Sequence, residues 1–256
     1  MQPKDRIIVA LDVDTPEAAI KLVSELKPHV GMFKIGMQLI YSMFAGMVTG
    51  TDGAALEIFA RSRELFGLVK GQLFTDLKFH DIFNTVAGAA KAISPINSAM
   101  FNLHASADVD AMMGAVANKS NSRVLAVTVL TSLGEEVVHL IYGDPAKGKV
   151  LEFARNAKLA GVDGLVCSPQ EVTMLRSRRE LKGMILVTPG IRPVWASKDD
   201  QTRVGTPAGA IEVGADYLVI GRPITNPPAE IGFPVDAVHK IVEEIVAIRT
   251  DKCAVQ

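Results

Sequence analysis

The chain has few cysteines and few aromatic residues, its acidic and basic residues nearly balance, and it has no long hydrophobic run. Two cysteines, Cys167 and Cys253, occur among 256 residues with no Cys-x-x-Cys pair, which excludes a disulfide framework. The formal net charge is -1 and the basic residues are scattered, so nothing indicates a nucleic-acid or membrane partner. The apolar runs are far shorter than the roughly 20 residues of a membrane-spanning helix, and the first residues lack the apolar stretch of a secretory signal. We therefore expect a cytoplasmic protein.

What the sequence does contain is a repeated alternation of short apolar runs with longer amphipathic segments. Hydrophobic residues make up 48% of the chain, enough to bury a large core. The amphipathic segments include a helix expected to begin after Thr15, with Pro16 in its first turn, and to run through Leu26. The runs expected to form buried strands are residues 6–11, 32–35, 72–76, 99–103, 124–129, 164–167, 184–187 and 217–220.

This number of strands limits the possible folds. Near-continuously apolar strands separated by helices indicate a parallel sheet that is covered on both faces. A doubly wound open sheet would give the same alternation, but the strand count and the chain length favour a closed (β/α)8 TIM barrel. No linker or low-complexity segment interrupts the pattern, so we expect this α/β fold to form a single domain over residues 1–256.

Polar side chains follow several of these strands, at the end of the barrel where TIM-barrel enzymes carry their chemistry. A charge at such a position is costly unless it is paired or used, so these residues form a candidate site. They are Asp12, Lys34, Asp76, Lys78, Thr131, Arg192 and Arg222.

The densest group of charges follows the third predicted strand. Asp76 and Lys78 are two residues apart on an extended segment, which points their side chains to the same side. Asp81 lies where the chain turns into the next helix and could be its N-cap. An ordinary ion pair followed by a helix cap is the alternative interpretation of these three residues.

The end of the last strand suggests a phosphate site. Gly221 and Arg222 follow that strand, where TIM barrels commonly bind phosphate, and arginine offers a planar pair of donors. Arg192 and Gln201 lie in a polar loop, residues 189–205, after the seventh strand. The histidines lack metal-ligand spacing, and no Walker or GxGxxG nucleotide-binding motif occurs, so we expect neither a metal nor a cofactor.

The order of these motifs resembles the orotidine 5′-monophosphate decarboxylases. Residues 76–86 (DLKFHDIFNTV) closely resemble that family's signature. The motifs that follow the family's order elsewhere are residues 9–12 (VALD), 33–36 (FKIG), 128–132 (TVLTS), 187–192 (VTPGIR) and 220–224 (IGRPI), together with Gln201. One departure is Phe83, where the family normally has proline; it puts the fine geometry of residues 81–85 in doubt.

The resemblance implies a function and a role for each residue. It implies decarboxylation of orotidine 5′-monophosphate to uridine 5′-monophosphate, the last step of UMP biosynthesis, by a cofactor-free homodimer. Lys78 would protonate a C6 carbanion, Asp76 would lie near the departing carboxylate, and Lys34 and Asp81 would complete an alternating charge network. Substrate contacts would come from Asp12, Lys34, Ile82, Thr85, Thr131, Ser132, Pro189, Arg192, Gln201, Gly221 and Arg222. Of these residues, Asp81, Ile82 and Thr85 would reach the partner subunit's site.

Two other functions remain open at this point. The related 3-keto-gulonate 6-phosphate decarboxylases and hexulose phosphate synthases share the Asp-x-Lys-x-x-Asp pattern but use a metal-stabilised enediolate. A non-catalytic nucleotide-phosphate binder on the same scaffold is the second alternative. It predicts the loss of at least one of Asp76, Lys78 and Asp81, and all three are present.

Overall fold

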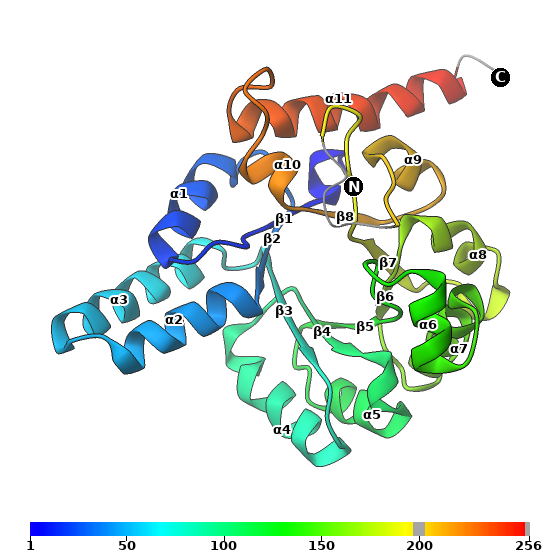
Figure 1. The fold of residues 1–256 in the computed structure, drawn as a ribbon, viewed down its shortest axis with the longest axis horizontal. Helices are drawn as coiled ribbons and strands as arrows, with labels where there is room; N and C mark the ends of the chain where they lie inside the picture. Colours follow the sequence, from blue (N-terminus) through cyan, green and yellow to red (C-terminus); the bar gives the residue numbers. More distant parts are fainter. Residues whose placement is uncertain (197–202, 254–256) are drawn as a thin grey trace.

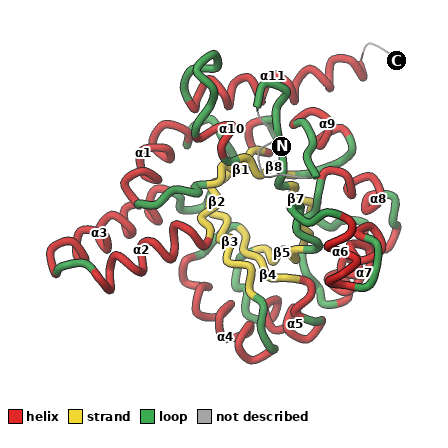
Figure 2. The backbone as a smooth tube through the Cα atoms, in the orientation of Figure 1, coloured by secondary structure: helices red, strands yellow, loops and turns green. Residues whose placement is uncertain are grey.

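The computed structural model describes residues 1–196 and 203–253, and its strands form a closed parallel barrel surrounded by helices (Figures 1 and 2). The strands are β1 Ile7–Ala10, β2 Met32–Gly36, β3 Leu73–Phe79, β4 Met100–His104, β5 Arg123–Val127, β6 Gly164–Val166, β7 Ile185–Thr188 and β8 Tyr217–Ile220. The α-helices are α1 Pro16–Leu26, α2 Met37–Thr49, α3 Asp52–Leu68, α4 Phe83–Ile93, α5 Val109–Ala117, α6 Glu135–Tyr142, α7 Ala146–Leu159, α8 Val172–Arg176, α9 Pro207–Glu212, α10 Arg222–Thr225 and α11 Pro234–Cys253.

Pairing between the first and last strands decides between the two predicted topologies. Each strand pairs in parallel with the next, and β1 also pairs with β8, with Ile8 opposite Val219. The TIM-barrel prediction is therefore confirmed, and the alternative of an open sheet is wrong. The carboxyl ends of all these strands meet at one rim of the barrel, so the polar residues that follow them are brought together.

Two apolar layers explain why the strands read as continuous hydrophobic runs. Ile7 and Val9 belong to the large cluster between the strands and the surrounding helices, whereas Ile8 belongs to a smaller cluster inside the barrel with Phe74 and Leu125. Alternate residues of one strand are thus buried on opposite faces.

The predicted start of the first helix is confirmed by its cap. The Thr15 hydroxyl accepts a hydrogen bond from the Ala18 N–H at 3.2 Å, and Pro16 is the first helical residue. Proline suits this position because its missing N–H would have no partner within the helix.

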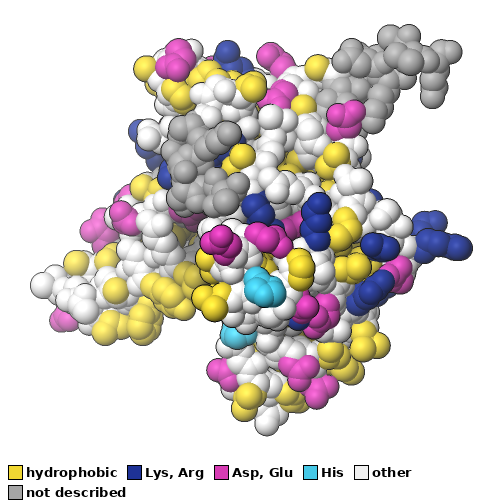
Figure 3. Space-filling model, turned by 45° about the vertical axis from the view of Figure 1, so that its right-hand side comes forward, with side chains coloured by type: hydrophobic (Ala, Val, Ile, Leu, Met, Phe, Trp, Pro, Cys, Tyr) yellow, Lys and Arg dark blue, Asp and Glu magenta, His cyan; other side chains and the backbone are white. Residues whose placement is uncertain are grey.

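A helical hairpin of α2 and α3 projects from the barrel (Figure 1). Its hydrophobic side chains gather on the projecting arm at the lower left of the space-filling view (Figure 3). On α2 the exposed apolar residues are Met37, Tyr41, Phe44 and Val48, a spacing that places them on one helical face. Within the described residues, no helix combines the length and the apolar character needed to span a bilayer.

Candidate active site

Two adjoining cavities lie at the carboxyl ends of the strands. The smaller, of about 230 Å³, is lined by Asp76, Asn102, Thr131 and Ser132 among others. The larger, of about 480 Å³, is lined among others by Asp12, Arg192, Gly221 and Arg222. Lys34, Lys78 and Pro189 line both cavities, so the two cavities form one site. The boundary between them carries the ammonium groups of Lys34 and Lys78.

Four charged side chains alternate in sign across this boundary. The Lys34 Nζ lies 2.9 Å from the Asp12 Oδ1 and 3.1 Å from the Asp76 Oδ2. The Lys78 Nζ lies 2.6 Å from the other carboxylate oxygen of Asp76. Asp76 is 5% exposed and Lys34 is 8% exposed, so the centre of the network is held away from bulk water. The structure thus brings together Asp12, Lys34, Asp76 and Lys78, and none of these contacts involves Asp81.

The network keeps its central members ionised despite their burial. Burial by itself favours neutral Asp76, but the ammonium groups of Lys34 and Lys78 outweigh it and lower the pKa of Asp76 to about 2. Burial likewise opposes the charge on Lys34, and the carboxylates of Asp76 and Asp12 raise its pKa nonetheless. The site therefore holds a fixed carboxylate between two cations at neutral pH.

Lys78 reaches this position through an irregular backbone. The pairing of β3 with β4 shifts register between Thr75 and Phe79, and Lys78 has a φ of 50°, in the left-handed region. Regular strand alternation, from which the sequence predicted the Asp76–Lys78 proximity, is therefore interrupted. The two side chains meet, but through a bulge that carries strain for a residue with a Cβ.

Asn102, in the middle of β4, holds both of these residues and was not predicted. Its Nδ2 donates to the Asp76 Oδ1 at 2.6 Å, and its Oδ1 accepts from the Lys78 N–H at 2.8 Å. Asn102 is 1% exposed. The one signal in the sequence was an amide side chain inside an otherwise apolar predicted strand, where burial requires hydrogen-bond partners.

Gly36 is a second residue that sequence reasoning missed. A Cβ built at this position would lie 3.0 Å from the Lys34 Nζ and 3.6 Å from the Asp12 Oδ1. The absence of a side chain therefore leaves room for the ammonium group between its carboxylates.

The segment of residues 81–85 lies outside both cavities in the single chain. Asp81, Ile82 and Thr85 are exposed, and Asp81 accepts a hydrogen bond from the Ile82 N–H at 2.7 Å. The alternative interpretation of Asp81 as the N-cap is wrong: Ile82 occupies that position, and no side chain caps the helix. Gln201 lies outside the described residues.

The unusual Phe83 is the first residue of α4, and its ring packs on α5. A Cβ built on Gly114 would lie 3.2 Å from two carbons of this ring, so the ring covers the surface of the glycine. The aromatic residue thus joins two helices at the point where the family pattern has proline.

In residues 1–196 and 203–253, no three His, Cys, Asp or Glu side chains are grouped so that they could hold a metal ion. The absence of a metal requirement stays a prediction.

Known proteins resemble this chain over nearly its whole length. A protein from Syntrophomonas wolfei subsp. wolfei named orotidine 5'-phosphate decarboxylase is 41% identical over 259 residues, which cover 96% of this chain and 99% of the relative. A protein of the same name from Heliobacterium modesticaldum is 43% identical over 256 residues, covering 96% and 97%. The solved structure of orotidine 5'-phosphate decarboxylase from Lactobacillus acidophilus superposes with a TM-score of 0.71 at 31% identity, covering 93% of this chain and 98% of that one.

The sequence pattern of a known family matches residues 5–231, which include every predicted site residue. Together with the relatives and the geometry of the rim, this match shows that the chain belongs to the Orotidine 5'-phosphate decarboxylase / HUMPS family.

Proposed function

We propose that this chain decarboxylates orotidine 5′-monophosphate to uridine 5′-monophosphate, the last step of UMP biosynthesis. The family match and the relatives named for this reaction support the assignment. The observation that carries it is the alternating row of Asp12, Lys34, Asp76 and Lys78 on the wall of a cavity. That row offers a proton donor beside a fixed negative charge, as this reaction requires.

Lys78 is the proposed proton donor. When the bond between C6 and its carboxylate breaks, CO₂ leaves and the electron pair stays on C6 of the pyrimidine. The Lys78 ammonium stabilises this charge and then transfers a proton to C6, which completes uridine 5′-monophosphate. Solvent returns the proton to Lys78. The contact at 2.6 Å with Asp76 orients the ammonium group before substrate arrives.

Asp76 acts on the substrate carboxylate in this proposal. Its charge persists because the pKa is held at about 2, so a second carboxylate beside it meets like-charge repulsion. The repulsion disappears as neutral CO₂ leaves, which lowers the barrier relative to the bound substrate.

The two cavities divide the remaining contacts between the parts of the nucleotide. The smaller cavity would hold the pyrimidine, with Thr131 and Ser132 at its edge. Asp12 and Lys34, at the boundary, would contact the ribose hydroxyls. The phosphate contacts, in the larger cavity and its loop, would come from Pro189, Arg192, Gln201, Gly221 and Arg222. Remote phosphate binding would then help to organise the charged centre.

We also propose that the enzyme is a homodimer that shares its sites. Asp81 lies away from the charge network of its own chain, and Ile82 is 70% exposed. An exposed acidic and apolar segment suits donation of Asp81, Ile82 and Thr85 to the partner's site, which two-fold symmetry makes reciprocal. The exposed apolar face of α2 supports association between subunits.

The sugar-phosphate enzymes remain the rival for the chemistry, since the description of the matched family also includes the HUMPS group. We propose the cofactor-free reaction because the named relatives are orotidine 5'-phosphate decarboxylases and the centre of the site is a row of paired charges. We also propose that the enzyme works in the cytoplasm.

One assay tests the function. Loss of orotidine 5′-monophosphate absorbance is followed with purified protein in excess EDTA, beside a Lys78→Ala variant. Rapid loss that requires Lys78 supports the proposal. Nucleotide binding without turnover would indicate a binding protein, and turnover of a sugar phosphate that requires magnesium would favour the rival.

A further inference from the structure

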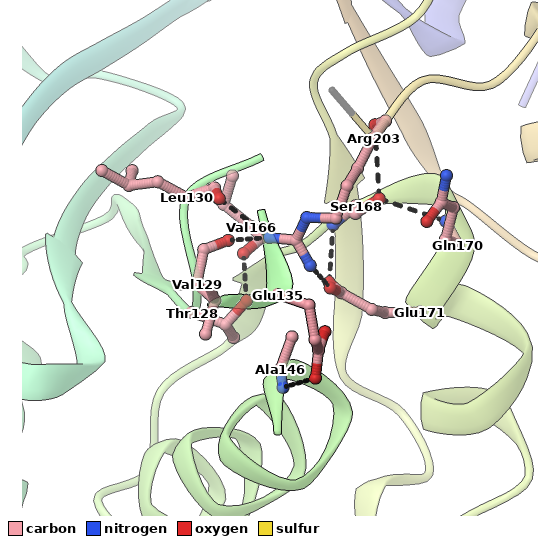
Figure 4. A network of polar contacts seen from close by, with 10 residues as sticks. All are labelled: Thr128, Val129, Leu130, Glu135, Ala146, Val166, Ser168, Gln170, Glu171 and Arg203. Carbon is pink, nitrogen blue, oxygen red and sulfur yellow. Dashed lines mark hydrogen bonds and ion pairs between the residues drawn. The ribbon is translucent and has the colours of Figure 1, made fainter. Parts of the chain in front are cut away.

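Arg203 lies at the second end of the loop that joins β7 to α9. The ends of this loop are held together by backbone pairing: the Arg192 N–H donates to the Gly205 carbonyl at 2.9 Å, and the Gly205 N–H donates to the Gly190 carbonyl at 3.2 Å. The side chain of Arg203 is 12% exposed and points away from the loop, toward two other segments of the rim (Figure 4).

The guanidinium of Arg203 contacts the segment that follows β5. Its Nη2 donates to the Val129 carbonyl at 3.1 Å and to the Leu130 carbonyl at 2.8 Å (Figure 4). The Leu130 carbonyl also accepts from the Leu133 N–H at 3.1 Å, which closes a turn over residues 130–133. One planar group therefore holds the first carbonyl of this turn.

The other side of the guanidinium is paired with Glu171, in the segment that follows β6. Glu171 is 1% exposed and forms an ion pair with Arg203 through its Oε1, while its Oε2 accepts from the Ser168 N–H at 2.8 Å. Burial raises the pKa of Glu171 although Arg203 acts in the opposite direction. Glu171 thus fixes the guanidinium of Arg203, and the hydrogen bond from the Ser168 N–H in turn fixes Glu171.

The turn held in this way forms a wall of the smaller cavity. Leu130, Thr131 and Ser132 all line that cavity, as do Asp76 and Lys78 of the charge network. None of these three residues of the turn lines the larger cavity, so a displacement of the turn would act first on the shape of the pyrimidine half of the site.

We propose that Arg203 is a positioning residue that fixes the 130–133 turn, and with it Thr131 and Ser132, against the smaller cavity. The inference rests on the proposed function only where it assigns the pyrimidine to that cavity. Glu171 keeps the guanidinium in place, and the two carbonyl contacts transmit its position to the turn.

Two ligands separate this role from a general effect on stability. Uridine 5′-monophosphate would occupy both cavities, whereas ribose 5-phosphate lacks the pyrimidine. In Arg203→Gln we expect the affinity for uridine 5′-monophosphate, measured by calorimetry, to fall about tenfold, because the turn loses contacts to a charged donor. The affinity for ribose 5-phosphate should stay within about twofold of the wild type, and the KM for orotidine 5′-monophosphate should rise more than kcat falls.

Arg176 offers a matched control on the opposite rim of the barrel. Its guanidinium also pairs with an aspartate, Asp216, at 2.6 Å, and donates to the carbonyls of Gly214 and Met184 at 2.8 Å each. Arg176→Gln removes the same kinds of contact, so it should lower stability and leave both affinities unchanged. The double variant Glu171→Gln with Arg203→Gln leaves no unpaired buried carboxylate, and it serves if Arg203→Gln alone does not fold.

Amide hydrogen exchange gives a readout that needs no ligand. Exchange over residues 130–134 should accelerate in the Arg203 variants and not in Arg176→Gln. Unchanged exchange in this segment, or an equal loss of affinity for both ligands, would overturn the inference. Failure of the proposed function would appear instead as absent turnover in the wild type, with the exchange result unaffected.

Discussion

Replacement of Asn102 by alanine is the sharpest test of how the charged centre is built. The buried amide donates to the Asp76 Oδ1 at 2.6 Å and accepts from the Lys78 N–H at 2.8 Å. Asn102→Ala removes both contacts and leaves Lys34, Asp12 and the reacting side chains chemically intact. Any change in rate then reports on position and not on the loss of a reacting group.

The magnitude follows from the two contacts. A hydrogen bond to an ionised group contributes about 1.5–3 kcal/mol, and a buried N–H left without a partner costs about 1–3 kcal/mol. The left-handed backbone of Lys78, at a φ of 50°, costs a further 1–3 kcal/mol or so. The hydrogen bond that the Lys78 N–H donates to Asn102 helps to maintain this conformation. If about 3 kcal/mol of this total is lost from the transition state, kcat falls about 100-fold.

Steady-state kinetics with a parallel unfolding curve would measure the effect. We expect kcat to fall much more than KM rises, since Asn102 does not line the larger cavity that is proposed to bind the phosphate. A kcat within twofold of the wild type, in a protein that is folded at the assay temperature, would refute the positioning role of Asn102.

The isosteric variant Asn102→Asp tests how a negative charge beside Asp76 changes the pH dependence of activity. It places a carboxylate oxygen where the amide nitrogen now lies 2.6 Å from the Asp76 Oδ1. Two carboxylates at this distance share a proton, so at low pH the variant retains a hydrogen bond and part of its activity. As pH rises, the shared proton is lost and repulsion disrupts the network. Activity should therefore fall with rising pH in the variant, over a range in which the wild-type Asp76, with a pKa of about 2, stays ionised.

Three further predictions concern stability and space. Gly36→Ala places a Cβ 3.0 Å from the Lys34 Nζ and should lower kcat/KM about tenfold with little change in the unfolding midpoint, as kinetics and thermal unfolding would show; unchanged kcat/KM would contradict the steric argument. The folded-state pKa of Asp76, about 2, lies below the ordinary value of 3.8, so its contribution to stability is complete above pH 4 or so and is lost as pH falls toward 2. Urea unfolding at several pH values should show this loss in the wild type and a weaker one in Asp76→Asn. Gly164→Ala forces a Cβ to within 2.6 Å of a carbonyl oxygen of β7 and should reduce the free energy of unfolding by about 1–3 kcal/mol, whereas Gly148→Ala, in open space on α7, should raise it slightly.

The positions of the strands could be predicted from the sequence because each is buried on two faces. Residues such as Ile7, Ile8 and Val9 must all be apolar when alternate side chains enter different cores, and this continuous pattern is readable without coordinates. The start of α1 was readable for a similarly local reason, since the Thr15 cap and Pro16 act within one turn. The order of motifs at the strand ends likewise identified the charged residues of the site.

Closure of the barrel and the supports of the site depend on contacts between distant segments. The pairing of β1 with β8 joins residues about two hundred positions apart, and no local pattern specifies it. Asn102 supports Asp76 from a neighbouring strand, and Arg203 contacts the turn after β5 across a long stretch of chain. An amide or a guanidinium carries no mark of its partner in the sequence, since its hydrogen bonds go to whichever atoms the fold brings within reach.

Around Lys78, one feature of the geometry could be predicted from the sequence and another could not. That Asp76 and Lys78 lie together follows from their spacing in the sequence, while the bulge and the left-handed backbone that deliver Lys78 follow from the shifted register of β3 on β4. Sequence thus determined which groups carry the charge, because their chemistry resides in the side chains. Tertiary structure decided how they are held, because Asp76 meets Lys34 and Asn102 only when β2 and β4 pack beside β3.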